Sequence, residues 1–365
     1  MDTVHAQRVL GLISGSSLDG INAAIITTDG VDVFEFGEAR EIPYDDELRD
    51  KLRWFHHNYT SAEEAQKQEL ENLLTQAHAT AIRDIIDSDD KQIDLVGFHG
   101  HTIVHKPDEH FIYHIGNAQQ LADSIGIKVV SRFRQADILS GGQGAPLSAV
   151  YHQALASAIE KPVAFVDIGG ISSLTWMGSN GELLAFDAGP GNNAINDWVF
   201  KHAGQHMDYN GKQAALGTVH MPIINQLMRH KFLAKHPPKA ADKATFKDKL
   251  EHLEGLSLQD GAATATSFVA EAIAYSIALY LPEAPKTLII CGGGAQNPTL
   301  VRFLRQRFDS TVVKTASELG WDASAIEAQA FAYLAARRVN LMPATYPFTT
   351  GVSMPCICGE VFEPK

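Results

Sequence analysis

Hydrophobic and polar positions alternate along the chain in blocks of two lengths, and the blocks follow the same order twice. Short apolar runs have the length of strands, and longer stretches repeat apolar residues every three or four positions, which is typical of helices. The first half predicts strands at 8–14, 21–27, 31–37, 93–98 and 127–131 and helices at 45–56, 62–87 and 117–124. The second half predicts strands at 162–168, 171–177, 182–187 and 286–291 and helices at 192–203, 220–233, 258–281, 297–308 and 323–338. The chain is therefore predicted to be an α/β protein with a repeated topology.

This repeat predicts two domains that face each other across a cleft, where ligands of α/β proteins bind. We place the first domain at residues 1–131 plus 340–365 and the second at residues 132–339. The last residues are expected to return to the first domain as a strand or loop. The lysine-rich segment 235–251 interrupts the pattern and is predicted to be a mobile flap or a surface excursion.

Charge and composition argue against several kinds of partner. The formal net charge is −13, with 43 acidic and 30 basic residues, so neither nucleic acid nor an anionic membrane is expected to bind. The apolar stretch 268–281 contains Glu271 and is too short to cross a bilayer. We see no secretory signal, and three cysteines provide no disulfide framework, so we expect a cytoplasmic protein. A homodimer is the default oligomer, and no heptad pattern indicates a larger assembly.

Two glycine-rich turns predict binding sites for phosphate groups. The first, Gly-Ser-Ser-Leu-Asp-Gly at 15–20, and the second, Asp-Ile-Gly-Gly-Ile-Ser-Ser at 167–173, each lie between two apolar runs. Backbone N–H groups and hydroxyls can hold phosphate oxygens there, and Asp19 or Asp167 can position a hydrated metal ion. We therefore predict a nucleotide triphosphate held between two related lobes.

A third glycine-rich run, Cys-Gly-Gly-Gly-Ala-Gln-Asn at 291–297, joins a buried strand to a helix. Its backbone can lie against a flat or phosphorylated ligand. The residues predicted to bind the nucleotide are Gly15, Ser16, Ser17, Leu18, Asp19, Gly20, Ile21, Asn22, Asp167, Gly169, Gly170, Gly292, Gly293, Gly294 and Asn297.

Two carboxylates are candidate catalytic residues. Asp187 is expected at the end of a strand, where Gly-Pro-Gly at 189–191 turns sharply into a helix. A carboxylate on such a rigid loop is well placed to act as a general base. Glu327 begins an apolar helical stripe, and because a carboxylate there is costly without a partner, we expect it at the edge of the cleft.

Two polar stretches predict contacts with a second ligand. The histidines of His-Gly-His-Thr-Ile-Val-His at 99–105 lie on a predicted loop and do not have zinc-site spacing, so they indicate hydrogen bonding to a sugar or simple loop polarity. Arg132 and Arg134 precede the glycine-rich stretch 140–146, and a guanidinium group suits a substrate carboxylate.

In this order, the motifs resemble those of the anhydro-N-acetylmuramic acid kinases of bacterial cell-wall recycling. The resemblance extends over nearly the whole chain and rests on residues 11–20, 99–102, 141–147, 187–192 and 291–297. It implies a two-lobed actin-like ATPase (ribonuclease H-like) fold with a duplicated ββ(β)αβα core and a central cleft. It also implies that ATP and Mg²⁺ are used to open the 1,6-anhydro ring with water and phosphorylate the freed 6-oxygen.

By motif match, Asp187 is the base that activates the water, and part of the chain's first half binds the sugar. The implied sugar-binding residues are His99, His101, Thr102, Arg134, Gly142 and Gln143. The chain departs from the family pattern at Ser16, Asn22, His101, Arg132, Asp167 and Ser173. Because positions 101 and 132 fall on the sugar side, a kinase for a related amino sugar stays open, as does a catalytically weak, nucleotide-bound sugar sensor.

Overall fold

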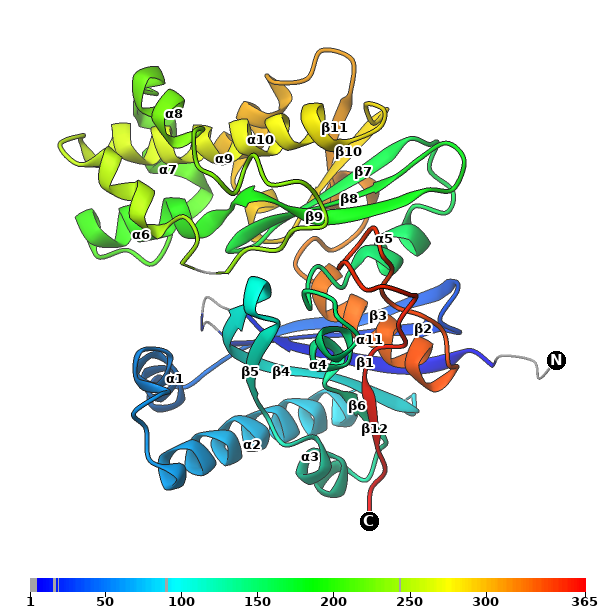
Figure 1. Ribbon diagram of the computed structural model, residues 1–365. Coiled ribbons are helices and arrows are strands. Elements are labelled where there is room, and N and C mark those ends of the chain that lie inside the picture. Colours follow the sequence, from blue (N-terminus) through cyan, green and yellow to red (C-terminus); the bar gives the residue numbers. More distant parts are fainter. Residues whose placement is uncertain (1–4, 16–17, 19, 89–90, 243) are drawn as a thin grey trace. The chain divides into compact units, whose positions relative to one another are not determined.

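Two compact units make up the chain, and each is built on one β-sheet (Figure 1). The computed structural model describes residues 5–15, 18, 20–88, 91–242 and 244–365. Unit 1 comprises Met1–Leu155 and Ala325–Lys365, and unit 2 comprises Ala156–Ser324.

Unit 1 contains most of the N-terminal elements and the C-terminal ones. Its strands are β1 (Gln7–Ser14), β2 (Gly20–Thr28), β3 (Val33–Pro43), β4 (Leu95–Lys106), β5 (Phe111–Ile115), β6 (Val129–Ser131) and β12 (Glu360–Phe362). Its helices are α1 (Asp46–Asn58), α2 (Glu64–Ser88), η1 (Pro107–Glu109), α3 (Ala118–Ile125), α4 (Phe133–Leu139), α5 (Ala149–Leu155) and α11 (Ile326–Val339).

Unit 2 contains the middle of the chain. Its strands are β7 (Val163–Ile168), β8 (Ile171–Met177), β9 (Leu183–Pro190), β10 (Thr287–Cys291) and β11 (Val312–Thr315). Its helices are α6 (Asn192–Ala203), η2 (Tyr209–Gly211), α7 (Lys212–Leu216), α8 (Met221–Leu227), η3 (Lys247–Leu253), α9 (Leu258–Tyr280), η4 (Gly293–Gln296), α10 (Pro298–Arg305) and η5 (Ala316–Leu319).

The two sheets have the same strand order. Unit 1 runs β3-β2-β1-β4-β6 and unit 2 runs β9-β8-β7-β10-β11. In each, the first three strands form an antiparallel meander, and the next two lie parallel to the first strand. This repeat confirms the predicted α/β class with a duplicated ββ(β)αβα core. Beyond β6, strand β12 adds antiparallel to the edge, so the C-terminal residues return to the first unit as predicted.

Helix α11 belongs to unit 1 because it lies directly on that sheet, against β1, β2 and β4. A Cβ atom at Gly11 would overlap the carbonyl oxygen of Ala328, and one at Gly97 would overlap that of Phe331, so the two glycines permit this close approach. Helix α5 packs on α11 in turn, and α4 packs on β5. These contacts place residues 132–155 and 325–339 in unit 1, whereas the sequence pattern had placed them in the second domain.

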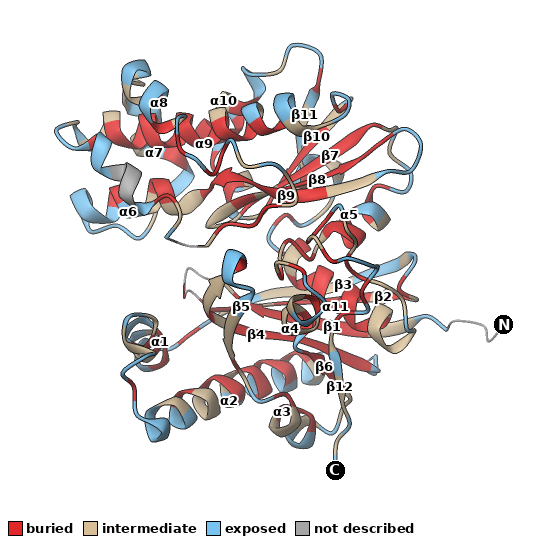
Figure 2. Ribbon diagram, in the orientation of Figure 1, coloured by how far each residue is buried: buried red, intermediate tan, exposed pale blue. Residues whose placement is uncertain are grey.

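Helix α9 is the central helix of unit 2. It has the length and hydropathy of a membrane span, yet 72% of its most apolar window is buried. Figure 2 shows it as buried along most of its length, and it packs against β9, α6, α7 and α10. This packing is typical of a core helix. A buried core helix can have the length and hydropathy of a membrane span.

The segment 235–251 differs from its prediction as a surface flap. Ala240, Ala241 and Phe246 are buried, and the Phe246 ring packs edge-on against Phe268 of α9. The lysines had suggested solvent exposure, but the small and aromatic residues between them bury this part of the segment in the core of unit 2.

Candidate active site

The predicted site residues fall into two groups, one in each unit. In unit 1, β1 and β2 form the predicted hairpin, in which Ser14 pairs with Ile21 and Ile13 with Asn22. Between the strands, the Leu18 amide donates to the Gly15 carbonyl at 3.2 Å, and Leu18 has a left-handed φ of 63°. Gly20 starts β2 at a point where a Cβ atom would overlap the Ile42 carbonyl. The predicted residues Ser16, Ser17 and Asp19 lie outside the described residues.

Strand β4 is longer than predicted and contains the histidine-rich motif. The sequence indicated a loop after residue 98, but β4 continues to Lys106 because it pairs with β5, a strand that the pattern missed. The histidines 99–105 are therefore fixed by a sheet and not by a loop.

His101 is fully buried, and both of its ring nitrogens have protein partners. Nδ1 lies 2.8 Å from Ser14 Oγ, and Nε2 lies 2.9 Å from His56 Nε2 on α1. Tyr44 donates its hydroxyl to Ser14 Oγ at 2.6 Å. A sugar contact by His101 would have to displace one of these partners, so its visible role is to hold Ser14 at the start of the first glycine-rich turn.

His99 and Arg134, predicted to bind the sugar, and Glu327, predicted to be catalytic, lie near one another in unit 1. The Arg134 guanidinium donates through Nε to His99 Nε2 and through Nη1 to the Gly144 carbonyl, both at 2.9 Å. Burial, together with the neighbouring His114 and Arg134, lowers the pKa of His99 well below its usual value, so His99 is a neutral acceptor for Arg134.

Glu327 occupies the first turn of α11. Burial raises the pKa of its carboxyl, and the positive charge of Arg134 opposes that shift. The elevated pKa suits a group that holds or passes on a proton. The rings of His99 and Phe331, the latter one helical turn after Glu327, lie 4.4 Å apart, which ties the histidine to the same helix.

Gly142 and Gln143 lie on a loop that is held mainly through its backbone. The Gly142 carbonyl lies 2.9 Å from His110 Nδ1, and the Gln143 carbonyl lies 2.6 Å from His105 Nε2. The fully buried Asp137 accepts from the Gly144 amide at 2.7 Å. A Cβ atom at Gly142 would overlap the Asp137 carboxylate, which explains the glycine.

The sequence pattern gave no role to Asp137. It contains an aspartate four residues before the Gly141–Gly142 pair, but no local pattern shows that this aspartate is buried. Thr102, another residue predicted to bind the sugar, contacts a histidine: its Oγ1 lies 2.6 Å from His114 Nε2. Burial lowers the pKa of His114 to about 3, so His114 is neutral as well.

In unit 2, Asp187 is a buried carboxylate with fixed orientation. It lies inside β9, three residues before the strand ends, and not at the strand end as expected. The Ser173 hydroxyl donates to Oδ1 at 2.7 Å from the neighbouring strand, and the Ala241 amide donates to Oδ2 at 2.8 Å. Helix α6 begins at Asn192, as the Gly-Pro-Gly turn predicted.

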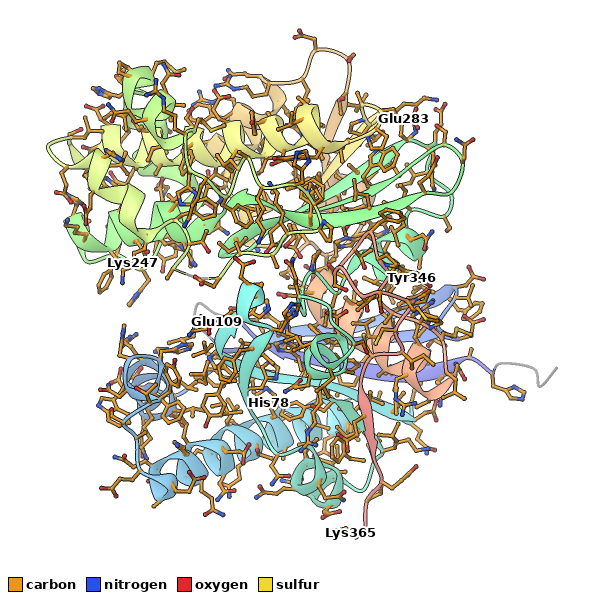
Figure 3. All side chains as sticks on the ribbon, viewed as in Figure 1. His78, Glu109, Lys247, Glu283, Tyr346 and Lys365 are labelled. Atoms are coloured by element: carbon orange, nitrogen blue, oxygen red, sulfur yellow. The ribbon has the colours of Figure 1, made fainter. Side chains whose placement is uncertain are left out.

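The second glycine-rich turn joins β7 to β8 and contacts the start of α6. The Asn192 amide donates to the Gly169 carbonyl at 2.8 Å, and the Gly191 amide donates to the Gly170 carbonyl at 3.2 Å. A small, open pocket lies at this turn, and Lys247, labelled in Figure 3, lies on its lining. The other residues that line the pocket are Gly170, Ile171, Pro190, Asn193, Ala194, Asp197 and Phe246.

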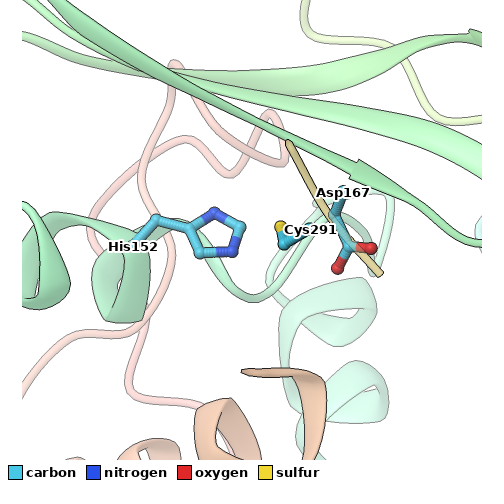
Figure 4. Close-up of side chains that lie close together, drawn as sticks. All are labelled: His152, Asp167 and Cys291. Carbon is cyan, nitrogen blue, oxygen red and sulfur yellow. The ribbon is translucent and has the colours of Figure 1, made fainter. Parts of the chain in front are cut away.

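Asp167 and the glycines 292–294 meet at the ends of adjacent parallel strands. Asp167 pairs with Cys291 across β7 and β10 (Figure 4). Gly292 has a φ of 71°, and a Cβ atom there would overlap the Asp167 carboxylate, while one at Gly294 would lie 2.5 Å from the Ile168 side chain. The bare backbone thus leaves the carboxylate oxygens of Asp167 beside a turn without side chains.

Asn297 has a structural role as the N-cap of α10. Its side-chain oxygen accepts from the Thr299 and Leu300 amides, both at 3.1 Å. Its predicted contact with the nucleotide would therefore have to come from the side-chain amide.

Comparison with known proteins identifies the family. The family model for anhydro-N-acetylmuramic acid kinase matches residues 7–364. The chain belongs to the anhydro-N-acetylmuramic acid kinase family. The family that the motifs predicted is thus confirmed, and the chain is an enzyme of a kinase family.

Curated anhydro-N-acetylmuramic acid kinases match over almost their whole length. The one from Bradyrhizobium diazoefficiens is 43% identical, over 97% of this chain and 99% of its own. The one from Paramagnetospirillum magneticum is 41% identical, with the same coverage. Among solved structures, component A of (R)-2-hydroxyglutaryl-CoA dehydratase from Acidaminococcus fermentans aligns over 92% of this chain and 99% of its own, with 12% identity and a TM-score of 0.47. The fold assignment rests on the repeated strand order within this chain.

Enzymes that transfer phosphoryl groups hold a divalent cation with oxygen ligands. Among the described residues of unit 2, the Asp167 carboxylate, beside the close approach that Gly292 permits, could supply such a ligand.

Proposed function

We propose that this chain opens 1,6-anhydro-N-acetylmuramic acid with water and phosphorylates its 6-oxygen from ATP, giving N-acetylmuramic acid 6-phosphate and ADP in peptidoglycan recycling. In this reaction, a water oxygen bonds to C1 as the bond between C1 and the 6-oxygen breaks. The 6-oxygen then bonds to the γ-phosphorus of ATP as ADP leaves. The relatives described above carry the name of this one activity, and no observation favours the alternative sugar or a sensor.

The proposal rests mainly on the geometry of Asp187. A general base needs a carboxylate that can reach the water and has little freedom to rotate. The donors Ser173 and Ala241 each take one oxygen of Asp187 and fix the plane of the carboxylate. In the proposed reaction Asp187 accepts the proton of the water that attacks C1.

The sugar is proposed to bind to the hydrogen-bonded polar residues of unit 1. Arg134, held by His99 and Gly144, suits the carboxylate of the muramic acid. Glu327, with its raised pKa, is proposed as a second catalytic group that exchanges a proton with the sugar oxygens. Thr102, Gly142 and Gln143 complete the proposed sugar site, and His101 acts through Ser14.

The nucleotide is proposed to bind at the glycine-rich turns. A bound magnesium ion would neutralise charge on the phosphates. Asp167 is the proposed ligand within the described residues, and Asp19 is a second candidate from the sequence. The backbone amides near Gly169, Gly170 and Gly292–Gly294 are proposed to donate to phosphate oxygens.

Mass spectrometry after incubation with magnesium, ATP and the anhydro sugar tests the proposal. A product heavier by one phosphate plus one water supports ring opening with phosphorylation. A gain of phosphate alone would indicate an ordinary sugar kinase, and an unchanged sugar would favour the sensor.

The Asp187→Asn variant tests the base. It keeps the shape and the Ser173 contact but cannot accept the proton, so turnover should fall by about 100- to 10,000-fold while ATP still binds. Wild-type turnover in this variant would exclude Asp187 as the base.

We further propose that the enzyme works in the cytoplasm, where ATP is available, without a nucleic-acid or membrane partner and as a homodimer. Light scattering at several concentrations measures the oligomeric state, and a constant monomer mass would contradict the dimer.

A further inference from the structure

The backbone of residues 239–241 contacts Asp187 at two points. The Asp187 amide donates to the Lys239 carbonyl at 2.9 Å, and the Ala241 amide donates to Asp187 Oδ2 at 2.8 Å. We call residues 239–241 the strap. Because the strap supplies a hydrogen-bond donor to the carboxylate, its position helps to determine the orientation of Asp187.

The buried side chain of Lys239 anchors the strap to the preceding loop. It is only 1% exposed, and its ammonium group donates to the carbonyls of Phe232 and Leu233 at 3.3 and 3.2 Å. The ammonium also faces three aromatic rings, with centroids at 4.3 Å for Tyr280, 5.0 Å for Phe232 and 5.6 Å for Phe186. Aromatic faces stabilise a cation that water does not reach.

Lys239 and Asp187 influence each other's charge. Burial lowers the pKa of Lys239 to about 8, the Asp187 carboxylate opposes that shift, and the positive charge of Lys235 adds to it. Tyr280 also lies at the ammonium, and burial raises its pKa; the His236 ring packs against the Tyr280 ring, with centroids 5.7 Å apart. Because electrostatic interaction is reciprocal, the ammonium favours the ionised form of Asp187.

We propose that Lys239 is a positioning residue for the catalytic base: its buried ammonium holds the strap on Asp187 and keeps that carboxylate ionised and ready to accept the proton of the attacking water. This inference rests on the proposed role of Asp187. It gives a function to a charge whose burial is otherwise costly, since a buried cation is retained where it has a specific partner.

A merely structural lysine would act differently. If Lys239 only filled the aromatic cluster, its replacement would lower stability and scale down activity at all pH values alike. A lysine that sets the charge state of Asp187 must instead change the pH dependence of the reaction.

The Lys239→Met variant separates these cases, because methionine keeps the length and the contacts with the rings but removes the charge. We expect kcat to fall about tenfold at neutral pH, and the acid limb of the profile of kcat/KM for the sugar to move up by about one pH unit. The KM for ATP should stay unchanged, and the product mass should be that of the wild type. The matched control is Lys231→Met, an exposed lysine of the same loop, which should leave the profile unchanged.

If the methionine variant does not fold, the pH profiles of kcat/KM for the wild type and for Lys239→Arg test the proposal instead. Wild-type activity should fall above pH 8 as Lys239 loses its proton, and Lys239→Arg, which stays charged, should extend activity to higher pH. A wild-type profile that is flat to pH 10, or an acid limb that Lys239→Met does not move, would overturn the positioning role. These results leave the role of Asp187 intact, whereas wild-type turnover in Asp187→Asn would remove that role and with it the inference.

Discussion

Units 1 and 2 share a strand order but present their chemistry in opposite ways. At equivalent places in the two sheets, β4 runs for 12 residues and β10 for 5. The extra length of β4 carries His99 and His101 on a paired strand, whereas β10 stops at the glycines 292–294. One topology therefore places histidine side chains at the end of β4 in unit 1 and glycine backbone at the end of β10 in unit 2.

The third strands differ in the same instructive way. No residue of β3 is buried, and its Glu35 forms an ion pair with Lys91 at the surface, whereas β9 packs against α9 and contains the buried Asp187. A buried carboxylate needs hydrogen-bond donors from the protein, and for Asp187 the Ser173 hydroxyl and the strap supply them. What covers a strand thus decides whether an acidic residue on it lies in water or is held by donors of the protein.

The largest expected effect comes from comparing the two carboxylates proposed to be catalytic. We predict a loss in kcat of about 100- to 10,000-fold for Asp187→Asn and a smaller one, about tenfold to 100-fold, for Glu327→Gln, since glutamine still donates a hydrogen bond but cannot release a proton. Steady-state kinetics of the two variants with both substrates measure this. Equal losses would contradict the separate roles of the two units.

Close packing should be less tolerant at Gly11 in unit 1 than at Gly189 in unit 2. Gly11→Ala places a Cβ atom against the backbone of Ala328, which cannot move without α11, so we expect a loss of about 3 kcal/mol in the free energy of unfolding. Gly189→Ala meets the Ala272 side chain at 2.8 Å and should cost about 1 kcal/mol. Urea unfolding of both variants gives the order, and a larger loss for Gly189→Ala would reverse the comparison.

Acid should destabilise unit 1 through its buried histidines. Burial lowers the pKa of His78 from 6.5 to about 4, so the unfolded chain binds the proton more readily than the folded one. The stabilisation is complete above pH 6.5 and is lost as the pH falls toward 4, and it should be about 2 kcal/mol smaller at pH 5 than at pH 7. Urea unfolding at the two pH values measures this for the wild type and for His78→Leu. An unaltered pH dependence in the variant would show that His78 is not responsible.

The smallest effect is expected for Asn297→Ala in unit 2. Loss of the N-cap of α10 should lower stability by about 1 kcal/mol. If the side-chain amide also binds the nucleotide, the KM for ATP should rise as well. A change in stability with an unchanged KM would limit Asn297 to its capping role.

Local sequence patterns predicted most of the elements. The boundaries of α6, α9 and β8 match within a residue, because the turns at 189–191 and the apolar periodicity are encoded locally. The pattern missed β5, since its few residues gain strand structure only by pairing with β4. It also assigned 325–339 to the wrong neighbours, because packing on Gly11 and Gly97 is not visible in either segment alone.

Some features of the candidate site were likewise predicted from the sequence, and others depend on tertiary packing. The sequence by itself determined the motifs, the repeated order of strands and helices, the kinase family and the choice of Asp187, because residue types and spacings suffice for these. Only the tertiary structure decided that His101 is enclosed by Ser14 and His56 and that Asp137 holds the Gly142 loop. The same is true of the burial of the Lys239 side chain. Each of these depends on which distant segments exclude water from a side chain, and burial is a property of the folded chain and not of any local run of residues.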